Sequence, residues 1–259
     1  MSGYQRIIYE KLDCAAVLTL NNPENQNRIG HSEVDELSDA VHQANNDPDV
    51  HAIILTGTGE YFCAGGRIDG FPNGYVLDQR VYADATVRFQ QALYQSGKAI
   101  IAAVQGHAFA GGLTVVEGCD LAVAAKDAKF GLTELSHGNF PMIALAVNSK
   151  SIPKKRLFEM IYFCSPIDSE TAEKWNLINK VVPAGEVMDA AMGYARMIAR
   201  RSPVAIRYGR QTYAEMMDLP LNQAMAHAKN AMVGMLATED VRESAIAKNE
   251  GRDPRWIGK

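Results

Sequence analysis

Cysteine, tryptophan and long apolar runs are scarce in this chain of 259 residues. The four cysteines, Cys14, Cys63, Cys119 and Cys164, lie far apart and form no C-x-x-C pair, so we expect free thiols and neither a disulfide framework nor a zinc site. No run of about 18 apolar residues is present to span a bilayer, and the first nine residues lack the apolar core of a signal peptide. These absences predict a cytoplasmic protein without a metal site.

Excess positive charge is also absent. The formal net charge is −4, which gives no reason to expect nucleic acid or an anionic membrane as a partner. The fractions of hydrophobic residues, 47%, and of charged residues, 22%, are ordinary for a globular protein. The length suits one large domain or a domain with an appendage.

Apolar runs alternate with helical patterns through the first half of the chain. Short strands are predicted at 15–20, 50–56, 99–104 and 121–125, and helices at 32–46 and 76–96. This alternation indicates an α/β fold with repeated crossover units and strands buried on both faces. From Pro153 onward the pattern becomes nearly all helix, with candidates at 170–175, 187–201, 204–217 and 221–236. We therefore expect a core over residues 1–198 and a helical region over residues 199–259.

Two glycine-rich turns follow predicted strands and are the first candidates for chemistry. One turn contains Gly66, and the other contains Gly111 and Gly112, where a short helix would begin. The free N–H groups at such a helix start can face a ligand oxygen. Two of these groups, near Gly66 and Gly111, could converge on one carbonyl oxygen and form an oxyanion hole. Tight strand–helix packing is the alternative explanation.

Several spaced motifs resemble those of the crotonase (enoyl-CoA hydratase/isomerase) superfamily. They are Phe62-Cys63-Ala64-Gly65-Gly66, Gly106-His107-Ala108-Phe109-Ala110-Gly111-Gly112 with Cys119-Asp120, Phe130-Gly131-Leu132-Thr133-Glu134, Trp175-Asn176-Leu177-Ile178-Asn179-Lys180-Val181-Val182, Ser202-Pro203, Thr238-Glu239-Asp240 and Asp253-Pro254-Arg255-Trp256. The resemblance covers essentially the whole chain. It implies a crotonase-like spiral of ββα units with a C-terminal helical trimerisation region, assembled as a homotrimer or a dimer of trimers.

The same resemblance implies an acyl-CoA substrate, of the kind found in fatty acid metabolism, and no separate cofactor, since coenzyme A is part of the substrate. The thioester oxygen would lie between the N–H groups of Gly66 and Gly111, which hold an enolate. Typical hydratases of the family carry a glutamate three residues after the second oxyanion glycine, and Thr114 stands there in this chain. The second family glutamate is present as Glu134.

A threonine hydroxyl is neutral near pH 7 and is no strong base. A single carboxylate can still move a proton between two carbons of a dienolate, so the sequence predicts double-bond isomerisation of an enoyl-CoA by Glu134. Hydratase or hydratase-lyase activity, with Thr114 or Glu117 placing water, is the alternative. A non-catalytic member used for acyl-CoA binding or assembly is a third reading, and C–C hydrolysis or decarboxylation also passes through an oxyanion.

Secondary candidates surround this set. Glu117 and His137 are possible additional acids, and most of Tyr75, Arg80, Tyr82 and Arg88 are expected to be solvated. By motif position, the resemblance implies a set of substrate-binding residues: Asn27, Arg28, Ala64, Gly66, Arg67, Ile68, Gly111 and Pro141. Arg67 stands where the family commonly has an aspartate, and it could contact phosphate.

Overall fold

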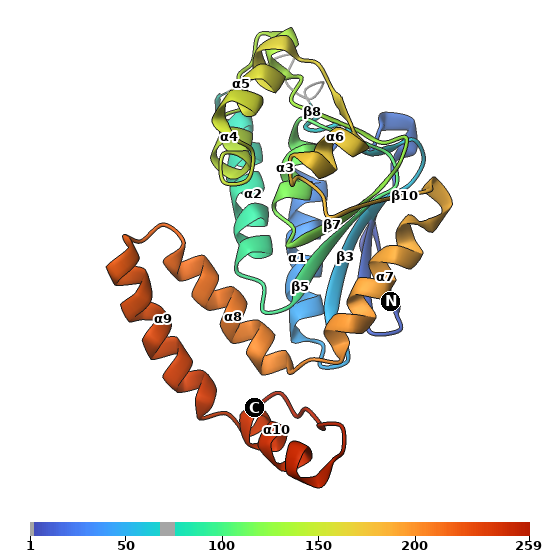
Figure 1. Cartoon of the computed structure of the whole chain (residues 1–259). Helices are drawn as coiled ribbons and strands as arrows, with labels where there is room; N and C mark the ends of the chain where they lie inside the picture. The colour runs from blue at the N-terminus through green and yellow to red at the C-terminus, as the bar shows by residue number, and fades with distance from the viewer. Residues whose placement is uncertain (1–2, 68–75) are drawn as a thin grey trace.

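A computed structural model describes residues 3–67 and 76–259 of the chain (Figure 1). Its larger described sheet has six strands in the order β1-β2-β3-β5-β7-β10. Their bounds are β1 Ile7–Leu12, β2 Ala15–Leu20, β3 Ala52–Gly57, β5 Ala99–Val104, β7 Leu121–Ala125 and β10 Lys180–Val182. β1 runs antiparallel to β2, and the other pairs are parallel.

A smaller described sheet has four strands in the order β4-β6-β8-β9. Their bounds are β4 Tyr61–Cys63, β6 His107–Phe109, β8 Lys129–Gly131 and β9 Ile167–Asp168. Each of β4, β6 and β8 directly follows a strand of the larger sheet, and α2 (Val76–Tyr94) and α3 (Gly111–Glu117) follow β4 and β6. The expected spiral of ββα units is therefore confirmed.

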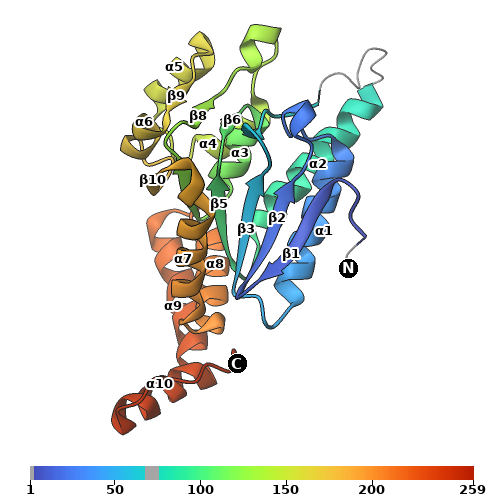
Figure 2. The ribbon, with the colours of Figure 1, turned by 90° about the vertical axis from the view of Figure 1, so that its right-hand side faces the viewer.

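Helices cover both faces of the larger sheet. α1 (His31–Asn46) and α2 pack together on one side, and α7 (Val187–Ala199) crosses β3, β5 and β7 on the other, as Figures 1 and 2 show. Every residue of β3 and β5 is buried between these layers. Parallel strands covered on both faces read as continuous apolar runs, which is why the sequence located β2, β5 and β7 to the residue.

Short helices flank β9 in the chain: α4 Met142–Asn148 and α5 Lys154–Phe163 precede it, and α6 Ser169–Lys174 follows it. The chain after Pro153 is less uniformly helical than expected, because β9 and β10 complete the two sheets there. α8 (Pro203–Met216) and α9 (Leu221–Leu236) form a helical hairpin that projects from the core, and α10 (Glu239–Glu250) ends it (Figure 1). The proposed boundary after residue 198 falls in the last turn of α7 and stays a prediction.

Several apolar side chains on the projecting hairpin are exposed to solvent. Leu221 is 73% exposed, Val233 61% and Leu236 58%, on a helix with no buried residue. A polar contact joins α10 to the start of α8, since Ser202 Oγ donates to the buried Asp240 carboxylate at 2.6 Å. Among the described helices, none combines the length and the apolar character that a membrane span requires.

Candidate active site

The ends of the short parallel strands gather the candidate residues. Tyr61 on β4 lies opposite His107 on β6, and Ala108 on β6 lies opposite Phe130 on β8. Parallel strands end at the same sheet edge, so the segments that follow all three strands meet there. These segments carry Gly66, Gly111 and Glu134 respectively.

The hydrogen bonds around the two turns pass over one backbone N–H group in each turn. A parallel bridge to Ile29 uses the carbonyl of Gly65 and the N–H of Arg67, and so passes over Gly66. Gly111 is the first residue of α3, where an N–H has no intrahelical acceptor. Within the described part of the chain, neither the Gly66 nor the Gly111 amide nitrogen donates a hydrogen bond. Gly66 N lies 3.6 Å from the position that a Cβ would take on Gly111, so the two amides belong to backbones in contact.

The close contact between the turns depends on a glycine. A Cβ on Gly112 would lie 2.0 Å from the carbonyl oxygen of Cys63 and 2.8 Å from its carbonyl carbon. Ala110, one residue before α3, adopts φ +51° and ψ −123°, a conformation that L side chains rarely take. The chain thus accepts strain at Ala110 and bare backbone at Gly112 to bring α3 against the end of β4.

Glu134 opens a short 3-10 helix, Glu134–His137, directly after this edge. Its Oε2 atom is buried and has no hydrogen-bond partner among the described residues. Burial raises the pKa of this carboxyl, and backbone hydrogen bonds from Glu134 and Thr133 partly oppose the rise. A carboxyl with a free buried oxygen and a raised pKa is suited to both taking and returning a proton.

Thr114 and Glu117 have different surroundings. Thr114 is buried, and its Oγ1 donates to the Ala110 carbonyl at 3.3 Å, back along its own helix. Glu117 lies one turn further and accepts a hydrogen bond from the Ser151 hydroxyl. Burial raises the pKa of Glu117 to about 8.

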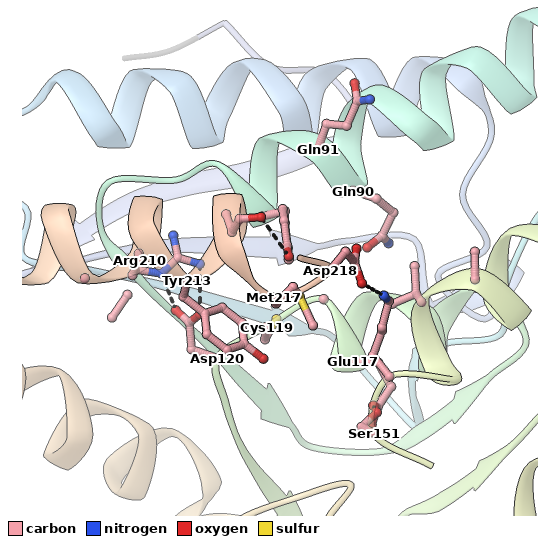
Figure 3. Close-up of a pocket in the computed structure, with 18 of the residues that line it drawn as sticks. Gln90, Gln91, Glu117, Cys119, Asp120, Ser151, Arg210, Tyr213, Met217 and Asp218 are labelled. Atoms are coloured by element: carbon pink, nitrogen blue, oxygen red, sulfur yellow. Dashed lines mark hydrogen bonds and ion pairs between the residues drawn. The ribbon is translucent and has the colours of Figure 1, made fainter. Parts of the chain in front are cut away.

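Glu117 faces a cavity of about 910 Å³ between α2, α3, α4 and α8. Figure 3 shows Glu117 beside Ser151 on the wall of this cavity. The lining residues do not include Gly66, Gly111 or Glu134. Glu117 therefore lines a cavity to which the two glycines and Glu134 do not contribute.

Comparison with known proteins identifies the family. The family model for enoyl-CoA hydratase/isomerase matches residues 10–259. The chain belongs to this family. It is 30% identical over 262 residues to a crotonyl-CoA hydratase of Syntrophomonas wolfei, a match that covers 99% of this chain and 100% of the relative. It is 29% identical to a short-chain-enoyl-CoA hydratase of Clostridium acetobutylicum, across 95% of each chain.

Solved structures of the enoyl-CoA hydratase/isomerase family superpose closely. A crystal structure of an enoyl-CoA hydratase from Bacillus anthracis gives a TM-score of 0.91 at 26% identity, covering 98% of this chain and 100% of that one. An enoyl-CoA hydratase from Mycobacterium tuberculosis gives 0.88 at 29% identity, covering 98% and 99%. The expected crotonase fold and the assignment as an enzyme of this family are confirmed.

Other residues that the family resemblance singles out have structural partners. Asn27 is 1% exposed, and its side-chain amide donates to the carbonyls of Thr58 and Tyr61 at 2.8 and 2.6 Å. Arg67 lies 3.3 Å from the Glu33 carboxylate, which also accepts from the N–H group before α1. Both side chains therefore shape the loop beneath the site, and their contact with substrate stays a prediction.

The remaining candidates divide by position. Arg28 lies beside the first turn, where its guanidinium donates to the Ala64 carbonyl at 3.4 Å. Pro141 is buried at the start of α4, and His137 is exposed with its ring 3.0 Å from the Ser136 hydroxyl. In the part of the chain that the structure describes, the His137 ring makes no hydrogen bond or ion pair with the Glu134 carboxylate, although both residues belong to the same short helix. Ile68 lies outside the described residues.

The helix that covers the site contains one residue whose role the sequence did not predict. Arg80 and Arg88 are exposed, as expected, and Tyr75 lies outside the described residues. Tyr82, by contrast, is mostly buried, with its hydroxyl against Gly66. Tyr82 lies three and seven residues before the buried Ala85 and Phe89, so helical periodicity would have placed it on the inner face of α2.

Proposed function

We propose that this enzyme adds water across the double bond of a 2-enoyl-CoA, with Glu134 as the group that moves protons. The observation that carries the proposal concerns one sheet edge. Two amides that donate no hydrogen bond among the described residues, Gly66 and Gly111, lie there with Glu134, whose buried Oε2 atom has no partner among those residues. The relatives named crotonyl-CoA hydratase and short-chain-enoyl-CoA hydratase support hydration as the reaction.

The chemistry proceeds in two proton movements. Water attacks the β-carbon while Glu134 takes one of its protons, and the π electrons move through the α-carbon onto the thioester oxygen. The N–H groups of Gly66 and Gly111 hold the negative charge that develops on this oxygen. The protonated Glu134 then gives its proton to the α-carbon, the carbonyl re-forms, and a 3-hydroxyacyl-CoA is released.

One carboxyl therefore serves as base and acid in turn. Thr114 donates its hydroxyl proton to a helix carbonyl, and Glu117 faces the separate cavity, so neither supplies a second carboxylate in this scheme. The raised pKa of Glu134 suits the dual role, because the group must hold a proton between the two steps and still release it.

Double-bond isomerisation is the second candidate, favoured by the same lone carboxyl. On a 3-enoyl-CoA, Glu134 would remove a proton from the α-carbon, form a dienolate on the same two amides, and return the proton at the γ-carbon. Isomerisation consumes no water, so its product has the same composition as its substrate. Hydration adds one water molecule to the substrate.

Isotopic labelling distinguishes the two reactions. The purified enzyme is incubated with crotonyl-CoA in water enriched in heavy oxygen, and with a 3-enoyl-CoA in deuterated buffer, and the products are analysed by mass spectrometry and NMR. Hydration gives a 3-hydroxyacyl-CoA that contains heavy oxygen. Formation of a 2-enoyl-CoA from the 3-enoyl-CoA, together with no reaction of crotonyl-CoA, would replace hydration by isomerisation.

A matched pair of variants tests the assignment of Glu134. Glu134→Gln should lower kcat by about 10²- to 10⁴-fold, the usual contribution of a general acid–base group. Glu117→Gln makes the same substitution in the separate cavity and should retain turnover. Full activity of Glu134→Gln would refute the assignment, and acyl-CoA binding without any turnover by the unaltered chain would favour the non-catalytic alternative.

We also propose that copies of this chain assemble as a trimer or a dimer of trimers. The exposed apolar side chains on α9 support this, since Leu221, Met225, Met232, Val233 and Leu236 are each more than half exposed in the single chain. Contiguous exposed apolar residues on a projecting helix are typical of an interface with another protein surface.

A further inference from the structure

The side chain of Tyr82 occupies the space that a residue with a Cβ would fill at Gly66. Its hydroxyl oxygen lies 2.5 Å from that Cβ position, and its Cζ and Cε1 atoms lie 3.2 and 3.5 Å from it. Since a carbon–carbon bond is about 1.5 Å long, the phenol oxygen lies within about 4 Å of the Gly66 Cα. A hydroxyl group on α2 therefore reaches the turn that carries the Gly66 amide.

The surroundings of Tyr82 keep its proton in place. Burial raises the pKa of the phenol to about 12; a hydrogen bond with Thr86 opposes the rise, and the nearby Cys63 and Glu134 add to it. The phenol therefore stays protonated at neutral pH and remains an O–H donor. The Glu134 carboxyl is thus close enough to this hydroxyl to act on its pKa.

The backbone at Gly66 makes room for this donor. Gly66 has no positive φ, so its conformation would allow an alanine there, and among the described residues the nearest atom to a Cβ is the Tyr82 hydroxyl oxygen. The amide of residue 66 would be present with either residue. The choice of glycine therefore preserves the hydroxyl's position and adds nothing to the amide itself.

We propose that the Tyr82 hydroxyl is a third hydrogen-bond donor to the thioester oxygen that the Gly66 and Gly111 amides hold. The inference rests on the proposed function of this site in thioester enolate chemistry. In the site, Tyr82 donates to the oxygen as negative charge develops on it, and its proton is not transferred. It thereby supplies stabilisation of the oxyanion on the side of the site that α2 covers.

Kinetics of a double-mutant cycle test the proposal. Tyr82→Phe keeps the ring and removes the donor, and should lower kcat for the 2-enoyl-CoA on the order of 10²-fold, as loss of one oxyanion donor does. Gly66→Ala keeps the amide but places a methyl group against the hydroxyl, so it should lower kcat similarly by displacing Tyr82. In the Tyr82→Phe background, Gly66→Ala should cost much less, since the nearest remaining ring atom lies 3.2 Å away.

A second measurement reads the hydrogen bond without turnover. The infrared carbonyl stretch of an isotope-labelled enoyl-CoA thioester, bound to the enzyme, falls with each donor that polarises it. Tyr82→Phe should raise this frequency relative to the unaltered enzyme. Tyr94→Phe makes the same substitution at the other end of α2, where the hydroxyl donates to the Ala214 carbonyl at 3.4 Å, and should change neither kcat nor the frequency.

The outcomes separate the proposal from the function on which it rests. An unaltered enzyme that binds the thioester but turns over no enoyl-CoA would overturn the proposed function, and the infrared shift would still decide the role of Tyr82. A folded Tyr82→Phe enzyme with unchanged kcat and an unchanged carbonyl frequency would overturn the donor role. A lower kcat with an unchanged frequency would also overturn it, because Tyr82 would then act only through packing.

Discussion

Substitution of Gly112 by alanine should disturb stability and catalysis together. The added Cβ would lie 2.0 Å from the Cys63 carbonyl oxygen, whereas a close C···O contact is about 3.3 Å, so α3 and the end of β4 must separate by roughly 1 Å. Overpacking typically costs about 1–3 kcal/mol and occasionally more, and alanine in a helix returns only about 0.5–1 kcal/mol. Because both clashing atoms belong to backbone, we expect a net loss of about 2 kcal/mol or more.

The same displacement moves one of the two proposed oxyanion amides relative to the other. Gly111 precedes the substituted residue, and Gly66 follows Cys63 by three residues, so the separation falls between the two donors. A misplacement of about 1 Å can cost on the order of 10²-fold in rate.

Thermal or denaturant unfolding measures the stability change, and kcat on crotonyl-CoA measures the second effect. Gly193→Ala is the control: Gly193 lies within α7, and a Cβ there would meet nothing within 4 Å, so this substitution should be neutral or stabilising by about 0.5–1 kcal/mol. A Gly112→Ala protein as stable and as active as the unaltered chain would refute the argument.

Two predictions concern pH. Burial raises the pKa of Glu134, and the proposed hydration requires the ionised form of this group. On acidification, kcat/KM should therefore fall at a pH above the ordinary glutamate pKa of about 4.3. A pH profile in which kcat/KM falls only at or below that value would contradict this prediction. The folded chain holds the Glu117 proton to about pH 8 while the unfolded chain releases it near pH 4.3, so the unfolded state binds fewer protons and stability falls as pH rises between these values. At about 1.4 kcal/mol per pKa unit this amounts to a few kcal/mol, and Glu117→Gln should remove the pH dependence in denaturant unfolding; an unchanged dependence would contradict the cause.

The elements that the sequence predicted well are those whose burial is uniform. β5 and β7 lie inside the sheet with helices on both faces, so their composition alone marks them. β1 was not predicted, because it is an edge strand on which only Ile7 is buried and polar residues interrupt the apolar pattern. An edge strand is defined by its pairing with β2, which no local pattern records.

Polar contacts between residues that are distant in the sequence could not be predicted from local patterns either. Arg210 on α8 binds both carboxylate oxygens of Asp120, at 2.8 and 2.9 Å, across 90 residues of sequence. The same guanidinium reaches the carbonyls of Leu93 and Ser96 at the end of α2. Such a contact requires three segments to be placed first, so neither charge alone predicts it.

In the candidate site too, short local motifs could be predicted from the sequence, whereas the placement of residues by tertiary packing could not. The two glycine turns could be found from the sequence because each is a short motif after a strand, and Glu134 because the segment around it resembles a motif of the family. The separation of Glu117 from them depends on which wall of α3 faces α4 and α8, and only the assembled helices decide that.

Gly66 illustrates why a backbone donor cannot be understood from its own motif. Any residue supplies an amide at that position, so the oxyanion role alone leaves the side chain unspecified. The missing Cβ has meaning only beside Tyr82, which arrives from α2 and fills the space. Residues 66 and 82 therefore act as a complementary pair, in which a larger residue at one position excludes the hydroxyl of the other. The donor role proposed for Tyr82 makes the reaction depend on α2 as well as on the two turns, so substitutions on the inner face of this helix should alter the reaction while both glycine motifs remain intact.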